Sequence, residues 1–91
     1  MEVEKIVARY LLEIEAVKLN PENPFTWASG WKSPIYCDNR RILSYPEMRS
    51  KIAEFLTQSV QENFGTSETV AGVATGAIAL GTLVADKMQK P

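Results

Sequence analysis

The spacing of apolar residues predicts three helices along the chain. In residues 2–15, apolar side chains recur at steps of three and four opposite a charged face: Val3, Ile6, Val7, Tyr10, Leu11 and Ile14. A second periodic run follows Ser44 and holds Met48, Ile52, Phe55, Leu56, Val60 and Phe64. A third run begins at Ile78 and reaches Met88. The first stripe needs a partner surface in the fold or on another subunit, and core packing is the favoured use.

Local signals predict where the second helix begins and ends. Ser44 and Glu47 have the spacing of a capping box, and Pro46 falls in the first turn, where its missing N–H costs nothing. Gly65 stands where a left-handed C-terminal cap is expected, so the helix should end near Asn63.

The stretch before the third helix is typical of a strand that turns sharply into a helix. Residues 69–73, TVAGV, suit a parallel strand buried on both faces, and Gly72 and Gly76 permit angles or close approaches that a Cβ would forbid. The other residues of the turn are small: Ala74, Thr75 and Ala77. Because a helix N-terminus offers unpaired amides and a positive dipole end, this turn is a candidate seat for a phosphate or pyrophosphate. An ordinary strand-to-helix turn explains the local pattern at least as well, and neither the G-x-G-x-x-G nor the P-loop fingerprint is present.

The order of these elements predicts an α/β fold. Helix, strand and helix are half of a doubly wound pattern, which would continue into another parallel strand after Lys90. Ahead of them, residues 16–19 are a brief extended segment, followed by the turn-rich break Asn20–Pro24.

The segment Phe25–Arg41 is rich in aromatic and basic residues. Residues 25–27 and 35–38 are interpreted as two strands that pair in a hairpin or β-arch around the turn signals between them. Aromatic rings beside hydroxyls and Lys32 would suit a flat, anionic ring. The alternative is that Trp27, Trp31 and Tyr36 serve packing, and that the basic side chains form a solvated rim.

Composition excludes several classes of function. Ten basic and eleven acidic residues leave a net charge of −1, so the chain has no electrostatic footprint for nucleic acid or an anionic membrane. No run has the length of a membrane span, and the chain is expected to be cytoplasmic. A single cysteine, Cys37, makes no internal disulfide, and without histidine neither a zinc site nor a histidine-based triad is expected.

Two segments of the chain resemble the orotate phosphoribosyltransferases of pyrimidine biosynthesis. They are FTWASGWKSPIYCDNR, Phe25–Arg40, and GVATGAIALG, Gly72–Gly81, with helices of the expected length before and between them. The resemblance runs over nearly the whole chain, and SG-x-KSP-x-Y-x-D-x-R is not a generic turn pattern. It implies an N-terminal hood of a helix and short strands in residues 1–45, with the base-binding arch. Residues 46–91 would then start the Rossmann-like parallel sheet of a type I phosphoribosyltransferase, incomplete at this length.

The resemblance also implies site residues and a reaction. The orotate pocket would be shaped by Ser29, Gly30, Lys32, Ser33 and Tyr36. The loop that receives the pyrophosphate of phosphoribosyl pyrophosphate would be Ala74, Thr75, Gly76 and Ala77. The family transfers a phosphoribosyl group to orotate, giving orotidine 5'-phosphate and diphosphate. Mg²⁺ is bound through the diphosphate, and homodimers share their sites. The arch is then expected to fold over the glycine bend, so that both substrates lie side by side.

The sequence departs from the family pattern in three respects. Some members carry a lysine where this chain has Ala28, and some have Tyr-Lys where it has Thr75-Gly76. Family members also continue with a mobile basic loop and a paired-acid motif for the ribose, and these 91 residues contain neither. No residue of this chain is therefore assigned as catalytic or as a metal ligand, and the chain alone is expected to be an inactive fragment. Two alternatives remain, another type I phosphoribosyltransferase with a different base and a non-catalytic α/β interaction module.

Overall fold

The computed structural model describes residues 2–91 and divides into two compact units. The first unit ends at Ile42 and the second is Leu43–Pro91. Each unit is described by itself. None of the helices in the described residues is both long and apolar enough to cross a membrane.

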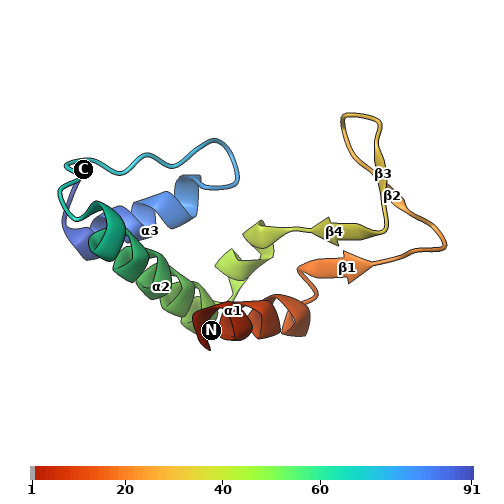
Figure 1. Ribbon diagram of the computed structural model, residues 1–91, viewed down its shortest axis with the longest axis horizontal. Helices are drawn as coiled ribbons and strands as arrows, with labels where there is room; N and C mark the ends of the chain where they lie inside the picture. The colour runs from red at the N-terminus through yellow and green to blue at the C-terminus, as the bar shows by residue number, and fades with distance from the viewer. Residues whose placement is uncertain (1) are drawn as a thin grey trace. The chain divides into compact units, whose positions relative to one another are not determined.

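The first unit joins one helix to two small antiparallel sheets (Figure 1). The helix is α1, Glu2–Glu13, and the strands are β1, Val17–Leu19, β2, Phe25–Thr26, β3, Lys32–Ser33, and β4, Ile35–Cys37. Strand β1 pairs with β4 in the register Lys18 to Tyr36, and β2 pairs with β3 in the register Phe25 to Ser33. The 3₁₀ helix η1, Asn39–Ser44, follows β4.

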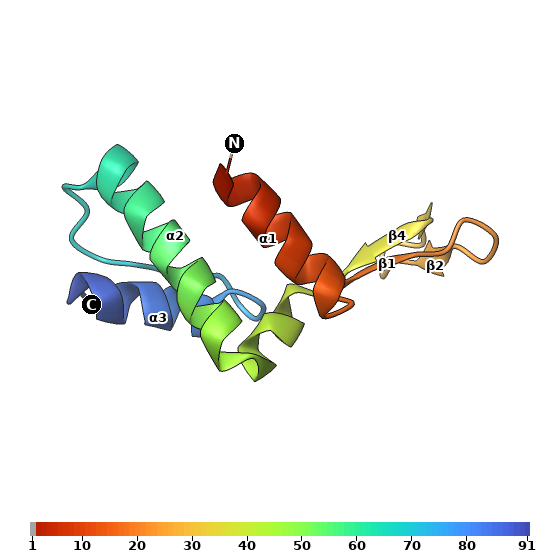
Figure 2. The same ribbon diagram turned by 90° about the horizontal axis from the view of Figure 1, so that it is seen from below.

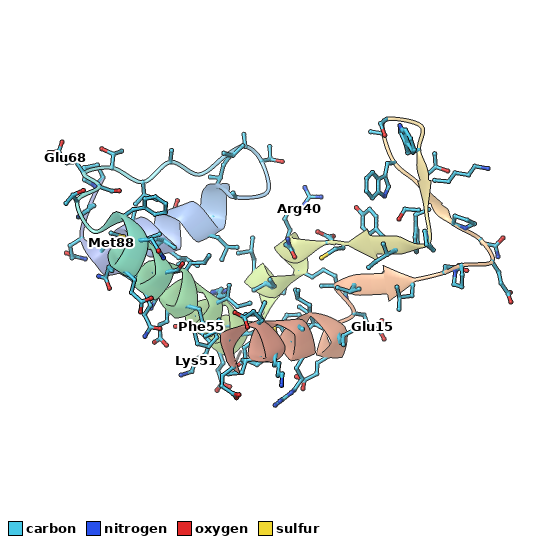
Figure 3. The ribbon with its side chains drawn as sticks, in the orientation of Figure 1. Glu15, Arg40, Lys51, Phe55, Glu68 and Met88 are labelled. Carbon is cyan, nitrogen blue, oxygen red and sulfur yellow. The ribbon has the colours of Figure 1, made fainter. Side chains whose placement is uncertain are left out.

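Helix α1 ends in a left-handed residue that is not glycine. Glu15 has φ +57°, its amide donates to the Leu12 carbonyl at 3.2 Å, and the Ala16 amide donates to the Leu11 carbonyl at 2.9 Å. This pair of bonds is the Schellman motif, which satisfies carbonyls at the end of a helix. Figure 3 shows Glu15 where the chain passes from α1 toward β1.

The predicted helix in residues 2–15 is confirmed, and its apolar stripe is covered in part. Ile14 is buried, at 6% exposure, and Val3 is 39% exposed. The other four residues of the stripe are half-buried: Ile6, Val7, Tyr10 and Leu11. Two-stranded sheets offer little apolar surface, so the first unit covers its helix only partly.

The strand pairing of the arch differs from the prediction. Residues 35–37 form a strand as expected, but its partner is the extended segment at residues 17–19 and not residues 25–27. Phe25 and Thr26 pair instead with Lys32 and Ser33, across a much shorter loop. Closing the shorter loop costs less chain entropy, which favours the local hairpin.

The second unit packs α2, Pro46–Phe64, against α3, Ile78–Met88, as Figures 1 and 2 show. Its buried residues are Ile52, Ala53, Thr57 and Val84. Gln89 caps the end of α3 at φ +55°, and its amide donates to the Asp86 carbonyl. The Lys90 amide donates to the Ala85 carbonyl. Both predicted helices are confirmed.

Three local predictions for this unit are wrong. Ser44 belongs to η1, the N-cap of α2 is Tyr45, and no side-chain capping bond forms, because the helix starts one residue later than a Ser44 cap requires. Gly65 is right-handed, with φ −60°, although α2 ends at Phe64, next to the expected end near Asn63. Residues 69–73 form no strand, because no described strand lies beside them to complete a ladder, and the Val70 amide donates to the Pro91 carbonyl at 2.8 Å.

Candidate functional site

The β2–β3 hairpin presents exposed aromatic rings at its tip. The Trp27 amide donates to the Trp31 carbonyl and the Gly30 amide donates to the Trp27 carbonyl, both at 2.8 Å. Gly30 closes this turn with φ +91°, a backbone conformation that residues other than glycine rarely adopt. Trp27 and Trp31 are 51% and 76% exposed, so their rings are available for stacking.

The chain turns a corner at Ser33, Pro34 and Ile35. The Ser33 hydroxyl donates to the Ile35 carbonyl at 2.9 Å and accepts from the Ile35 amide at 3.2 Å. The Asn20 amide donates to the Pro34 carbonyl at 2.7 Å. Beyond the corner, the Tyr36 ring lies 5.6 Å from the Phe25 ring, tilted by 43°. The first and the last aromatic ring of the arch are thus in tilted contact.

The basic side chains of this segment divide into engaged and free groups. Arg40 Nε lies 3.5 Å from Asp38 Oδ1, and Arg41 Nε donates to the Ile14 carbonyl at 3.0 Å. Figure 3 shows Arg40 on the 3₁₀ helix η1. Lys32 is exposed, and its ammonium group has no partner among residues 2–91. Lys32 is therefore the basic group of the hairpin that remains available to an anion.

The five residues predicted for the orotate pocket have two different roles in the hairpin. Gly30 and Ser33 are used by the backbone, one through its positive φ and the other through both bonds of its hydroxyl. Ser29, Lys32 and Tyr36 are exposed, and the polar groups of their side chains make no bond within the described chain. All five lie on or next to the β2–β3 hairpin, in the first unit.

The predicted pyrophosphate loop forms the turn before α3, in the second unit. The Ala77 amide donates to the Val73 carbonyl at 3.0 Å and the Ile78 amide to the Thr75 carbonyl at 3.3 Å. Within the described residues, the amides of Ala74, Thr75 and Gly76 donate to no protein acceptor. Ala77 is the N-cap of α3 and makes no side-chain capping bond. Three of the four predicted amides are thus free, beside an uncapped helix N-terminus.

The glycines of this turn are not equivalent. A Cβ on Gly72 would lie 2.5 Å from the Ala77 carbonyl oxygen, whereas a Cβ on Gly76 would meet nothing within 4 Å. The close approach predicted at Gly72 is confirmed, but Gly76 shows neither a close approach nor a positive φ. The prediction missed Gly81, which packs against Gly72. A glycine in the first turn of a helix was the available signal.

A hollow of about 270 Å³ lies beside this turn, between α3 and the chain that precedes it. Val70, Gly72, Ile78, Gly81, Thr82, Ala85 and Pro91 line it. Its lining is mostly apolar and holds no charged side chain. Among residues 2–91, no cluster of three or more histidine, cysteine, aspartate or glutamate side chains could hold a metal ion. The prediction that the hairpin and the turn share one cavity stays a prediction.

The chain is similar over nearly its whole length to curated orotate phosphoribosyltransferases. It is 60% identical to that of Porphyromonas gingivalis over 87 residues, which are 96% of this chain and 41% of the relative. It is 52% identical to that of Cytophaga hutchinsonii over 91 residues, which are 100% of this chain and 44% of the relative. The chain therefore spans less than half the length of these relatives. No family model matches the sequence.

Solved structures agree with the sequence comparison. The orotate phosphoribosyltransferase of Aeropyrum pernix has a TM-score of 0.79 and 29% identity, covering 93% of this chain and 49% of that structure. The UMP synthase of Leishmania donovani has a TM-score of 0.78 and 27% identity, covering 93% of this chain and 18% of that structure. The predicted α/β fold and the predicted resemblance are confirmed: the chain matches the N-terminal two fifths of orotate phosphoribosyltransferases.

Proposed function

We propose that this chain supplies the base-binding and diphosphate-binding segments of an orotate phosphoribosyltransferase. The observation that carries the proposal is the match to these enzymes along nearly the whole chain, at 60% identity to one of them. The hairpin and the turn before α3 add chemistry that suits the two substrates.

The hairpin suits a flat acid. Orotate is a planar ring with a carboxylate, so it needs a stacking face and a cation. Tyr36 and the exposed indoles offer faces, and Lys32 offers a free ammonium group. Ser29 adds a hydroxyl that makes no other bond in the described chain.

The turn before α3 suits a diphosphate. Free amides at Ala74, Thr75 and Gly76 are donors, and the positive end of the α3 dipole favours negative charge. The open space at Gly76 lets a phosphate oxygen approach the backbone. These residues bind and orient the leaving group while orotate nitrogen forms its bond to the anomeric carbon and the bond to diphosphate breaks.

The donor set of the turn indicates how magnesium would enter. Amides and one hydroxyl are donors to phosphate oxygens, and none of the four residues carries a carboxylate for a cation. Mg²⁺ would therefore be bound through the diphosphate, and it would neutralise the negative charge that develops there. We further propose that the protein acts as a homodimer, since the apolar face of α1 is only partly covered. We also propose that it acts in the cytoplasm.

A fluorescence titration of this chain tests base recognition, with Trp27 and Trp31 as reporters. Orotate is expected to bind more tightly than uracil, adenine or hypoxanthine, because only orotate has a carboxylate for Lys32. Equal affinity for orotate and uracil would contradict the assignment. Tighter binding of adenine or hypoxanthine would favour another type I phosphoribosyltransferase. Absence of binding to any base or to phosphoribosyl pyrophosphate would favour an interaction module.

A second experiment tests the enzymatic role. This chain alone is expected to form no orotidine 5'-phosphate above a blank without enzyme. A chimera that joins it to the remaining three fifths of the Porphyromonas gingivalis relative is expected to form that product. An inactive but folded chimera, beside an active parent enzyme, would refute the proposed role.

A further inference from the structure

The chain passes from one small sheet to the other within a single residue. Strand β3 pairs with β2, strand β4 pairs with β1, and only Pro34 separates β3 from β4. A change of partner over so short a distance requires a defined bend, and proline removes one backbone donor that could hold it.

The hydroxyl of Ser33 supplies the bonds that hold this bend. On either side of β4, the Pro34 carbonyl accepts from the Asn20 amide, and the Asp38 amide donates to the Ala16 carbonyl, so both groups face β1. Because antiparallel ladders alternate, Ile35 directs its amide and carbonyl away from β1. Ser33 Oγ meets both groups, at 3.2 and 2.9 Å.

The bend lies directly before the Tyr36 ring. Phe25 is the cross-strand partner of Ser33, and its ring packs against that of Tyr36, the residue that follows Ile35, at a tilt of 43°. We infer that Ser33 is a positioning residue, which acts on the base through the orientation of Tyr36 and does not contact the base itself. This inference rests on the proposed function of the hairpin.

The hydrogen-bonding capacity of serine supports positioning over direct contact. A hydroxyl has one proton to donate, and that of Ser33 is already donated to the Ile35 carbonyl. Orotate presents a carboxylate and ring carbonyls, which need donors. Ser33 would have to break the bend to serve them, whereas Ser29 and Lys32 are free to do so.

Three variants of this chain test the inference. Ser33→Ala removes both bonds, Ser33→Thr keeps the hydroxyl, and Ser50→Ala makes the same chemical change on the exposed face of α2. Ser33→Ala is expected to weaken orotate binding about tenfold and to weaken the nuclear Overhauser contacts between the Phe25 and Tyr36 rings. Ser33→Thr and Ser50→Ala are expected to retain both properties. Full ring contacts in Ser33→Ala would overturn the inference.

A double-mutant cycle with Tyr36→Leu separates positioning from direct contact. If Ser33 acts through Tyr36, Ser33→Ala causes no further loss of orotate affinity in the Tyr36→Leu chain. Additive losses would overturn the inference. The ring contacts are measured without orotate. If the wild-type chain fails to bind orotate, the proposed function is refuted, but the ring contacts still decide whether Ser33 positions Tyr36.

Discussion

Gly72 and Gly81 are in backbone contact: a Cβ on Gly81 would lie 2.9 Å from the Gly72 Cα and 3.2 Å from its nitrogen. The contact brings the segment before the turn against the first turn of α3, and the residues with free amides, 74–76, lie between the two glycines in the chain. It also reverses the ordinary effect of a helical glycine, since alanine normally stabilises a helix interior.

Gly81→Ala is therefore expected to destabilise the chain by about 1–3 kcal/mol, because backbone atoms must move to admit the methyl group. Urea unfolding measures the change. Gly76→Ala is the control for stability, since its methyl group would meet nothing within 4 Å. A Gly81→Ala chain as stable as wild type would show that the close contact does not persist in solution.

Thr57→Val is expected to stabilise the chain. Thr57 is 7% exposed on α2, and its hydroxyl has no partner among the described residues. Valine keeps the shape and removes the unsatisfied polar group, a gain of about 1 kcal/mol. Thr82→Val is the matched control, because Thr82 is exposed and its hydroxyl donates to the Ile78 carbonyl at 2.9 Å. Thermal unfolding that shows equal shifts for both variants would contradict a special cost at Thr57.

Glu15→Gly is expected to stabilise the first unit by about 1 kcal/mol, because Glu15 holds a left-handed conformation that glycine adopts without strain. The same substitution at Glu62, within α2, is expected to cost about 1 kcal/mol, because glycine is a poor helix former. Urea unfolding of the two variants compares them directly. A loss of stability at both positions would mean that Glu15 does not end α1 in this way.

Lys32→Gln is expected to weaken orotate binding about tenfold, since it replaces a charge-assisted bond by a neutral one. Uracil, which lacks the carboxylate, is expected to lose much less. Lys87→Gln, in the last turn of α3, is the control for net charge. The difference between wild type and Lys32→Gln should also shrink as salt rises, because exposed charges are screened. Identical losses for orotate and uracil would place the Lys32 ammonium away from the carboxylate.

Local sequence signals predicted the helices better than their ends. The apolar spacing of α2 and α3 depends on one buried face, and that face is set by the order of side chains alone. The ends depend on single backbone conformations. The left-handed residues are Glu15 and Gln89 rather than Gly65, because the Schellman bonds at α1 and α3 offset the strain of a side chain at positive φ.

The candidate site divides in the same manner. Its candidate residues come from two motifs that are visible in the sequence, SG-x-KSP-x-Y and the small residues of the glycine turn. Their roles could not be predicted, because Ser29 and Ser33 are identical in type and differ only in what surrounds them.

The sequence by itself determined the three helices, the turn before α3 and the resemblance to a family. Only the tertiary structure decided which strands pair, that Gly81 rather than Gly76 is crowded, and that Lys32 keeps a free charge. The physical reason is range: periodicity and turn chemistry act between near neighbours, whereas pairing, crowding and partners for a charge depend on groups brought together by folding.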